Sequence, residues 1–286
     1  MEINGETRLT GIIGYPLTYT ISPQIHNAAF DKVQLNIGYV PMVVRPNDLA
    51  NAIVGLQALG FIGFNVTMPH KESAVKHLDR LDSEAQVVGA VNTISFAGGQ
   101  RVGHNTDVKG FLAALAEVGF KPEAPSSVVI GAGGAARAVV AALASLGAEV
   151  AVANRNRTRS EALVNDIKER LPNSHLKVLE FDEGFADKII DAELIVNATP
   201  VGMTPLQDET PVDADLLHSG QAVFDLVYEP AETRLIREAT NKGARTIGGL
   251  RMLLHQAAAS FEIWTGTPAP LAAMADAAIL ALRRGS

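Results

Sequence analysis

Three groups of polar side chains in the first 107 residues carry functional groups suited to acid–base chemistry and to anion binding. The hydroxyls of Thr20 and Ser22 stand two residues apart, so both would lie on one face of an extended segment. The same spacing separates the Asn65 amide from the Thr67 hydroxyl. Lys71 belongs to this second group, and the third group contains Asn92 and Asp107. Each group lies at the carboxyl end of a predicted strand, which is where ligands bind in open α/β sheets.

Several of these side chains also have a purely structural interpretation. Ser22 could cap a helix that begins at Pro23, and Asp107 could cap a helix that begins at Val108. Lys71 could be a solvated lysine at the start of a helix. Residue type alone does not decide between these alternatives.

A glycine turn after an apolar run is typical of a dinucleotide phosphate site. The run Val128–Ile130 leads into a Gly-x-Gly-x-x-Ala turn and then into an alanine-rich helical pattern. The first glycine makes the turn, the second lets the backbone approach the phosphates, and the helix N-terminus supplies free N–H groups. A turn that only packed a helix would not need the second glycine. We predict cofactor contacts at Gly131, Ala132, Gly133, Gly134 and Ala135.

The end of the next predicted strand, Glu149–Ala153, indicates which dinucleotide is bound. An NAD site usually has an acidic residue there, but this chain continues Asn-Arg-Asn-Arg-Thr-Arg. Guanidinium groups suit a 2′-phosphate because they pair with it through charge-assisted hydrogen bonds. The alternative is a solvated first turn of a helix over Ser160–Arg170, where each cation would oppose the helix dipole by about 0.3–1 kcal/mol. We therefore predict NADP, held by Asn154, Arg155 and Arg159.

Composition excludes several other classes of function. A formal charge of −7 argues against nucleic acid as a partner, and no apolar run is long enough for a membrane helix. The absence of cysteine excludes disulfides, a catalytic thiol and thiolate-bound zinc, and the histidines show no metal-ligand spacing, so we predict no metal site. The N-terminus lacks a signal-peptide pattern, which favours a cytoplasmic protein. Either a monomer or a homodimer is compatible with this composition.

Short apolar runs alternate with helical patterns along the chain, which predicts an α/β fold with two domains. A mostly parallel α/β sheet domain would comprise residues 1–107 with 248–286, and a Rossmann-type NADP-binding domain residues 108–247. The last two predicted helices, Leu250–Thr265 and Pro270–Arg284, would return to the first domain. Within the first domain we also expect a helix near His70–Leu78.

The motifs in this order resemble those of the shikimate dehydrogenase family, over nearly the whole length from Gly14 to Leu282. They are Ser22-Pro23 with His26-Asn27, Asn65-Val66-Thr67-Met68-Pro69-His70-Lys71, Gly89-Ala90-Val91-Asn92-Thr93, Gly103-His104-Asn105-Thr106-Asp107, the glycine turn, Asn197-Ala198-Thr199-Pro200-Val201-Gly202-Met203, Asp225-Leu226-Val227-Tyr228, and Gly248-Gly249-Leu250-Arg251-Met252-Leu253 leading to Gln256-Ala257. Members of this family reduce 3-dehydroshikimate to shikimate with NADPH, a step in aromatic amino-acid (chorismate) biosynthesis.

The resemblance implies that Lys71 and Asp107 are the catalytic pair. It also implies a set of residues that hold the substrate's hydroxyls and carboxylate: Thr20, Ser22, Asn65, Thr67, Asn92, Tyr228 and Gln256. On the cofactor side, the strand that ends before Thr199 and Pro200 would pass beside the ribose and nicotinamide. A small residue at Gly249 would let the nicotinamide ring lie close to the backbone. Val227 and Met252 complete the predicted cofactor contacts.

One departure from the family pattern leaves the substrate open. The hydroxyl pair is most often Ser-x-Ser, whereas this chain has Thr20-Ile21-Ser22, and the extra methyl group could narrow the pocket. A quinate/shikimate dehydrogenase paralogue, with different substrate or NAD use, is therefore one alternative. A non-catalytic NADP-binding regulator on the same scaffold is another, although such a protein would not need Lys71 and Asp107 together.

Overall fold

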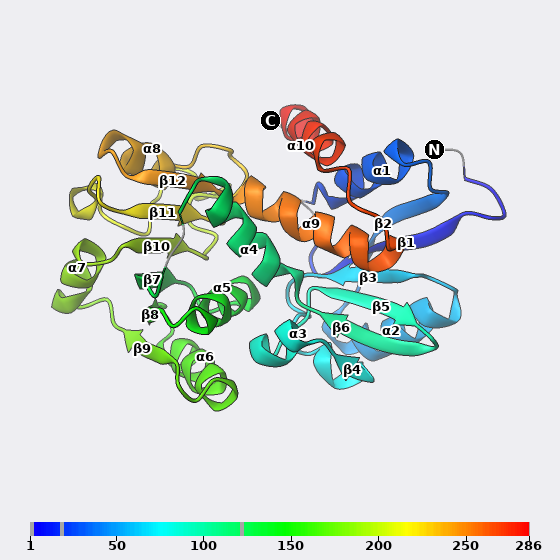
Figure 1. Ribbon diagram of the computed structural model, residues 1–286, viewed down its shortest axis with the longest axis horizontal. Coiled ribbons are helices and arrows are strands. Elements are labelled where there is room, and N and C mark those ends of the chain that lie inside the picture. Colours follow the sequence, from blue (N-terminus) through cyan, green and yellow to red (C-terminus); the bar gives the residue numbers. More distant parts are fainter. Residues whose placement is uncertain (1–2, 18–19, 121–122, 286) are drawn as a thin grey trace. The chain divides into compact units, whose positions relative to one another are not determined.

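The computed structural model describes residues 3–17, 20–120 and 123–285, and the chain forms two compact units (Figure 1). One unit comprises Met1–Lys109 and Leu254–Ser286, and the other comprises Gly110–Leu253. The divisions fall inside helices α4 (Thr106–Glu117) and α9 (Gly249–Thr265). The boundaries predicted from the sequence, after residues 107 and 247, lie near the starts of the same two helices.

The first unit contains a six-stranded sheet in the order β2-β1-β3-β5-β6-β4. Its strands are β1 (Arg8–Gly14), β2 (Ile37–Val43), β3 (Gly63–Val66), β4 (Arg80–Leu81), β5 (Thr93–Ala97) and β6 (Gln100–His104). Strand β1 pairs in parallel with β2 and β3, and β4 pairs in parallel with β6. Strand β5 is antiparallel to both of its neighbours. Only Gly98 and Gly99, both with positive φ, connect β5 to β6, and a turn this short forms a hairpin rather than a parallel crossover.

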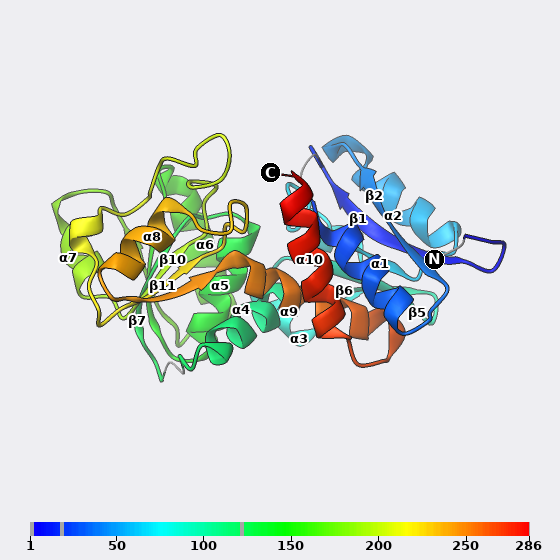
Figure 2. The same ribbon diagram turned by 90° about the horizontal axis from the view of Figure 1, so that it is seen from above.

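The helices of this unit are α1 (Ser22–Lys32), α2 (Leu49–Ala58), α3 (Ser83–Val88) and α10 (Leu271–Gly285), together with the parts of α4 and α9 that belong to it. Short 3₁₀ turns occur at Pro46–Asp48 and Val75–His77. Helices α1 and α10 lie side by side (Figure 2). Phe64 and Ile13, both fully buried, belong to a core that also includes Leu49, Ile53 and Leu56 of α2, and each contributes roughly 1.5–3 kcal/mol through apolar burial.

The prediction of a helix near His70–Leu78 is wrong. The segment forms turns and the short 3₁₀ turn instead. The carbonyl of Lys71 accepts a hydrogen bond from the Val91 N–H, so it is not available to a helical N–H four residues on. A contact distant in sequence therefore overrides the local helical pattern, and it fixes the backbone at Lys71.

The second unit contains a fully parallel sheet in the order β12-β11-β10-β7-β8-β9. Its strands are β7 (Ser126–Ile130), β8 (Glu149–Ala153), β9 (His175–Leu179), β10 (Leu194–Asn197), β11 (Ala222–Asp225) and β12 (Arg245–Gly248). Its helices are α5 (Gly134–Ser145), α6 (Arg157–Arg170), α7 (Glu183–Ile190) and α8 (Arg234–Asn241), with a 3₁₀ turn at Ala214–Leu216. Numbered from β7, the strand order is 3-2-1-4-5-6, which is the doubly wound dinucleotide-binding order. The predicted Rossmann-type fold is confirmed, and its topological switch point lies between β7 and β10.

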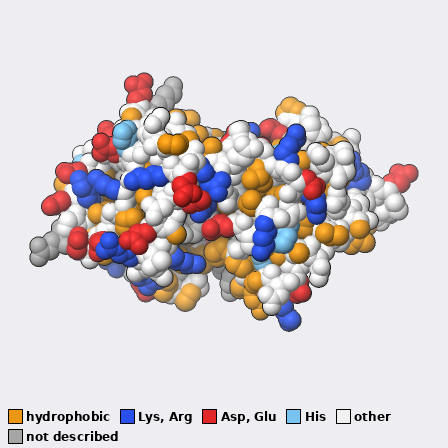
Figure 3. Space-filling model, turned by 90° about the horizontal axis from the view of Figure 1, so that it is seen from below, with side chains coloured by type: hydrophobic (Ala, Val, Ile, Leu, Met, Phe, Trp, Pro, Cys, Tyr) orange, Lys and Arg blue, Asp and Glu red, His pale blue; other side chains and the backbone are white. Residues whose placement is uncertain are grey.

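Within the described residues no helix is both long and apolar enough to cross a membrane. On the face of the molecule in Figure 3, basic and acidic side chains are interspersed. That face therefore carries mixed charge rather than a field of one sign.

Candidate active site

Lys71 and Asp107 form a partly buried ion pair in the first unit. Their Nζ and Oδ2 atoms are 2.6 Å apart, and the side chains are 15% and 7% exposed. Asp107 lies within the first turn of α4, which begins one residue earlier, at Thr106, so the expected helix start at Val108 is wrong. The N-terminal end of a helix stabilises a carboxylate, and the ammonium retains two further N–H donors. The pair thus presents a proton donor that is oriented by a fixed anion.

Asn92 holds the other oxygen of the Asp107 carboxylate. Its Nδ2 atom donates to Asp107 Oδ1 at 3.0 Å and lies 2.8 Å from Thr106 Oγ1 and 3.2 Å from Gln256 Oε1. Its Oδ1 atom accepts from the Thr106 N–H at 2.7 Å. Gln256, which is predicted to bind substrate, comes from helix α9, so residues far apart in the sequence meet at Asn92.

Asn65 links a second group of residues to this one. Its Oδ1 atom accepts a hydrogen bond of 2.7 Å from the Tyr39 hydroxyl. Its Nδ2 atom lies 3.1 Å from the Asn92 carbonyl oxygen, 3.0 Å from Thr93 Oγ1 and 3.1 Å from Ser260 Oγ. The Asn65 amide therefore has protein partners at both ends and orients its neighbours.

The hydrogen-bonded side chains around Asn65 and Asn92 form one polar network. Ser22 joins this network through Tyr39 and does not cap a helix. Helix α1 begins at Ser22, its N-cap residue is Ile21, and no side chain caps it. The Ser22 side chain is buried and hydrogen-bonds to Tyr39. Burial raises the pKa of the Tyr39 phenol well above its usual value, so the phenol is neutral and donates to Asn65.

The remaining predicted substrate residues of this unit lie at strand and helix ends. The Thr20 hydroxyl accepts a hydrogen bond of 3.3 Å from the Ser22 N–H. Thr67 directly follows β3, and its methyl group packs so closely on Gly14 that a Cβ there would lie 2.5 Å from it. Gly14 is thus needed to bring the end of β1 against Thr67.

Four members of the network were not predicted as site residues: Tyr39, Thr93, Thr106 and Ser260. Thr93 and Thr106 stand beside Asn92 and Asp107 in the quoted motifs, so their position was a signal. Ser260 lies one helical turn after Gln256, on the same face of α9. Nothing in the sequence marks Tyr39 as a site residue, because a tyrosine within a strand pattern is usually a residue of the hydrophobic core.

His26 is fully buried, and its ring stacks on Tyr39 at 4.5 Å between centroids. Burial lowers the pKa of the His26 imidazole to about 3, so it is neutral at ordinary pH. It packs beneath the network as a core residue.

His104 ties the β5–β6 hairpin to helix α3. Its Nδ1 atom lies 2.9 Å from Asp82 Oδ2, and its Nε2 atom lies 2.9 Å from Ser95 Oγ. Asp82 also caps α3 by accepting from the Ala85 N–H. This chain of contacts braces the end of β6, three residues before Asp107.

In the turn after β7, glycine occupies positions 131 and 133 for different physical reasons. Gly131 has φ of 123°, and a Cβ there would lie 2.7 Å from the Ala198 carbonyl oxygen. Gly133 has ordinary backbone angles, and a Cβ there would meet nothing within 4 Å. Neither packing nor conformation requires glycine at position 133. Open space in front of the N-terminus of α5, where Gly134 and Ala135 begin the helix, fits the close approach of a pyrophosphate.

Of the three arginines after β8, one is paired with acidic residues and the other two are exposed. Arg157 forms ion pairs with Glu161 and Glu180. Within the described part of the chain, Arg155 and Arg159 have exposed side chains that no acidic group pairs. Helix α6 begins at Arg157 and not at Ser160, because Asn156 caps it by accepting from the Arg159 N–H. Asn154 Nδ2 donates to the Asn156 carbonyl oxygen and shapes the turn.

A buried carboxylate organises the loops after β10 and β11. Asp225 accepts from Asn197 Nδ2 at 2.9 Å, from the Val227 N–H at 3.0 Å and from Thr233 Oγ1 at 2.6 Å. Burial nonetheless raises the pKa of Asp225 to about 6. The Asn197 amide oxygen in turn accepts from the N–H and the hydroxyl of Thr199.

The other predicted cofactor and substrate residues of this unit lie close after the ends of β10, β11 and β12. Pro200 is exposed, Val227 is buried, and Tyr228 is half-buried, where burial and then Glu229 raise the pKa of its phenol. Gly249 begins α9, and a Cβ there would lie only 2.2 Å from the Leu226 carbonyl oxygen. Met252 is buried one turn further on.

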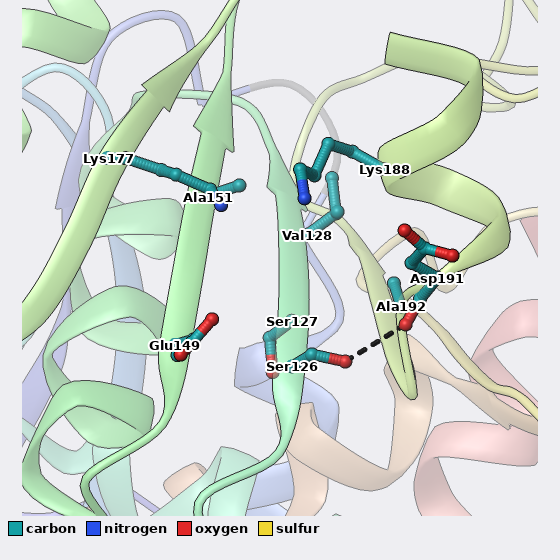
Figure 4. A pocket seen from close by; sticks show the side chains of 9 residues that line it. All are labelled: Ser126, Ser127, Val128, Glu149, Ala151, Lys177, Lys188, Asp191 and Ala192. Carbon is teal, nitrogen blue, oxygen red and sulfur yellow. Dashed lines mark hydrogen bonds between the residues drawn. The ribbon is translucent and has the colours of Figure 1, made fainter. Parts of the chain in front are cut away.

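A separate hollow lies over the strands β7, β8 and β9 (Figure 4). Ser126, Glu149, Lys177, Lys188 and Asp191 are among the residues that line it. Ser126 and Glu149 begin their strands, so this end of the hollow is opposite to the edge that carries the glycine turn. The hollow is therefore distinct from the predicted cofactor site.

Three family profiles match the chain in sequence order. The shikimate dehydrogenase substrate binding domain matches residues 12–94, the shikimate/quinate 5-dehydrogenase domain matches residues 115–214, and the shikimate 5′-dehydrogenase C-terminal domain matches residues 249–279. A curated relative from Methanopyrus kandleri, named shikimate dehydrogenase (NADP(+)), is 45% identical over 99% of this chain and 99% of its own.

Solved structures agree with the profiles. A shikimate dehydrogenase in complex with NADP⁺ has a TM-score of 0.92 and 41% identity, and covers 98% of both chains. The shikimate 5-dehydrogenase of Thermus thermophilus, in complex with NADP(H) and shikimate, has a TM-score of 0.85 and 36% identity, covering 98% of this chain and 100% of that one. On its fold, its ordered motifs and these full-length similarities, the chain belongs to the shikimate dehydrogenase family.

Proposed function

We propose that the protein is an NADP-dependent shikimate dehydrogenase, which interconverts 3-dehydroshikimate and shikimate. The observation that carries this proposal is the Lys71–Asp107 pair, held by Asn92 inside a polar network. Full-length relatives with this activity in their names support it. In this proposal the first unit binds the substrate and the second binds NADP.

The residues of the second unit fit the cofactor. The open position at Gly133 and the N-terminal N–H groups of α5 suit a pyrophosphate. Arg155 and Arg159 suit the 2′-phosphate because both are exposed close after the end of β8, and their guanidinium groups can pair with a phosphate through charge-assisted hydrogen bonds. The loop at Thr199 and Pro200, with Val227, Gly249 and Met252, would hold the ribose and nicotinamide. NADPH, when bound, supplies a hydride to the substrate carbonyl carbon.

Lys71 would act at the oxygen of the reacting carbon. When the ketone is reduced, this oxygen gains negative charge, and an ammonium nearby stabilises that charge and then donates the proton that completes the alcohol. In the reverse direction, the neutral amine of Lys71 accepts the hydroxyl proton as hydride leaves, and the ammonium is restored. The hydride carries both electrons of the reduction, and the proton balances the charge on the oxygen.

Asp107 would orient Lys71. Its Oδ2 atom is committed to Nζ and its Oδ1 atom to Asn92, so the carboxylate cannot rotate away without breaking both contacts. Thr20, Ser22, Asn65, Thr67, Asn92, Tyr228 and Gln256 are proposed to surround the substrate's hydroxyls and carboxylate. Ser22, Asn65, Asn92 and Gln256 already share one network.

Substitution of Lys71 tests the mechanism. Lys71→Ala removes the proton donor, so kcat for shikimate oxidation with NADP⁺ should fall by about 10²–10⁴-fold, while NADP⁺ affinity measured by calorimetry stays unchanged. Lys76→Ala is the matched control, because Lys76 is an exposed lysine five residues further along. A Lys71→Ala variant that turns over as fast as the control would refute the role of Lys71.

A further inference from the structure

Ser260 is fully buried on α9 and contacts four parts of the polar network. Its Oγ atom lies 2.7 Å from Thr93 Oγ1, 3.1 Å from Thr106 Oγ1 and 3.1 Å from Asn65 Nδ2. It also lies 3.0 Å from the Gln256 carbonyl oxygen, one turn earlier in the helix. A side chain at this helix position therefore joins strands β3 and β5 to the start of α4.

The hydroxyl of Ser260 is fully used. It has one proton, which the Gln256 carbonyl can accept, and two lone pairs for the donors that face it. Asn65 Nδ2 is one such donor, and one of the two neighbouring hydroxyls, that of Thr93 or that of Thr106, is the other. Because the site excludes solvent, the loss of this hydroxyl would leave several buried polar groups short of a partner.

Two paths lead from Ser260 to the proposed substrate site. One passes directly to Asn65. The other passes through Thr106, whose Oγ1 accepts from Asn92 Nδ2, and the same amide group donates to Asp107. The position of the catalytic carboxylate thus depends on an amide whose own partner is held by Ser260.

We propose that Ser260 is a positioning residue for the substrate site, which fixes the Asn65 amide and, through Thr106 and Asn92, the Asp107 carboxylate. This inference rests on the proposed function. It adds a residue of helix α9 that acts through its neighbours and touches neither substrate nor cofactor in this scheme.

Ser260→Ala is the first test. Because the variant loosens Asp107 and not the cofactor unit, kcat/KM for shikimate should fall by about tenfold, the change that follows from about 1.4 kcal/mol of lost transition-state stabilisation. Most of the loss should appear in kcat, since Asp107 orients the proton donor in the transition state. KM for NADP⁺ should stay within about twofold of the wild-type value. A general destabilisation of the protein would not lower kcat while leaving this KM unchanged.

Two controls separate positioning from loss of structure. Thr265→Val, on the same helix, removes a hydrogen bond of the same kind, from Thr265 Oγ1 to the Phe261 carbonyl oxygen. This bond lies outside the polar network, so the variant should keep the wild-type kcat/KM. Trp264, the only tryptophan, donates from Nε1 to the Ile94 carbonyl, so its fluorescence reports whether α9 still packs on β5. Ser260→Ala should keep the wild-type emission.

A double-mutant cycle that combines Ser260→Ala with Thr106→Val completes the test. If Ser260→Ala does not fold, Thr106→Val alone still tests the same path. Thr106→Val cuts the same path from its other side with little change in volume, so it should also lower kcat/KM, and the double variant should lose little more than the larger single loss. Wild-type kinetics in Ser260→Ala, independent additive losses, or wild-type kinetics in Thr106→Val would each overturn the inference. An inactive wild-type protein would instead refute the proposed function, and the inference with it.

Discussion

At the level of single residues, the chemistry depends on which polar groups are already satisfied. The Lys71 ammonium gives one donor to Asp107 and keeps two for a ligand. The Asn65 and Asn92 amides, by contrast, have several protein partners each. Their predicted contact with substrate is therefore combined with a second task, the orientation of neighbouring side chains.

The same distinction among the arginines gives a prediction about cofactor choice. Arg157 is neutralised by two glutamates, whereas Arg155 and Arg159 are exposed and, in the proposed function, bind the 2′-phosphate. Replacing both Arg155 and Arg159 by Ala should raise KM for NADP⁺ by about 10–100-fold, a loss of roughly 1.5–3 kcal/mol for charged hydrogen bonds, and leave KM for NAD⁺ nearly unchanged.

Arg157→Ala is the matched control for this measurement, because its charge is already paired. Steady-state kinetics with both cofactors would show the effect. Equal losses for NADP⁺ and NAD⁺ in the double variant would contradict a 2′-phosphate site at these arginines.

At the level of elements, the β7–turn–α5 unit separates a glycine needed for packing from one needed for a ligand. Gly133→Ala places a methyl group in open space, so the free energy of unfolding should change by less than about 1 kcal/mol. NADP⁺ affinity should nevertheless fall at least tenfold, because the methyl group occupies the approach of the pyrophosphate. Calorimetric titration and urea unfolding of the same preparation measure both quantities. A variant that keeps its NADP⁺ affinity would show that the phosphates bind elsewhere.

Local sequence patterns predicted the helices and strands whose formation depends mainly on residues within the same segment. The parallel strands from β7 to β12 and the helix after Gly133 are examples, since apolar runs and a glycine turn encode them directly. The segment at His70–Leu78 was mispredicted because the Val91 N–H, distant in sequence, takes the carbonyl of Lys71. Ser260 and Tyr39 could not be found in this way either, since their importance arises only when α9 and β2 pack beside Asn65.

At the level of the whole molecule, the two units should respond to pH in opposite directions. His26, in the first unit, has a pKa lowered from 6.5 to about 3, so the stability that depends on its neutral form is present above pH 6.5 and is lost as pH falls towards 3. Asp225, in the second unit, has a pKa raised from 3.8 to about 6, so the stability from its protonated form is present below pH 3.8 and is lost as pH rises through 6.

Acidification should therefore weaken the first unit selectively. Between pH 6.5 and pH 5, His26 alone should remove about 2 kcal/mol from its unfolding free energy, at about 1.4 kcal/mol per pH unit. Urea unfolding followed by Trp264 fluorescence, which reports the first unit, should then move to lower urea than unfolding followed by far-UV circular dichroism. His26→Phe, which keeps an aromatic ring but cannot titrate, should reduce the separation to the part that Asp225 contributes. Coincident transitions at both pH values in the wild type would contradict this account.

The central claim, that this protein oxidises shikimate with NADP⁺, is tested most directly by absorbance at the reduced-nicotinamide band. Shikimate and quinate are each combined with NADP⁺ and with NAD⁺ in four parallel reactions of the purified protein. The proposed function predicts rapid reduction with shikimate and NADP⁺ and much slower reduction in the other three, and the preference for NADP⁺ is attributed to Arg155 and Arg159. Preference for quinate or for NAD⁺, or no reduction in any of the four, would contradict it.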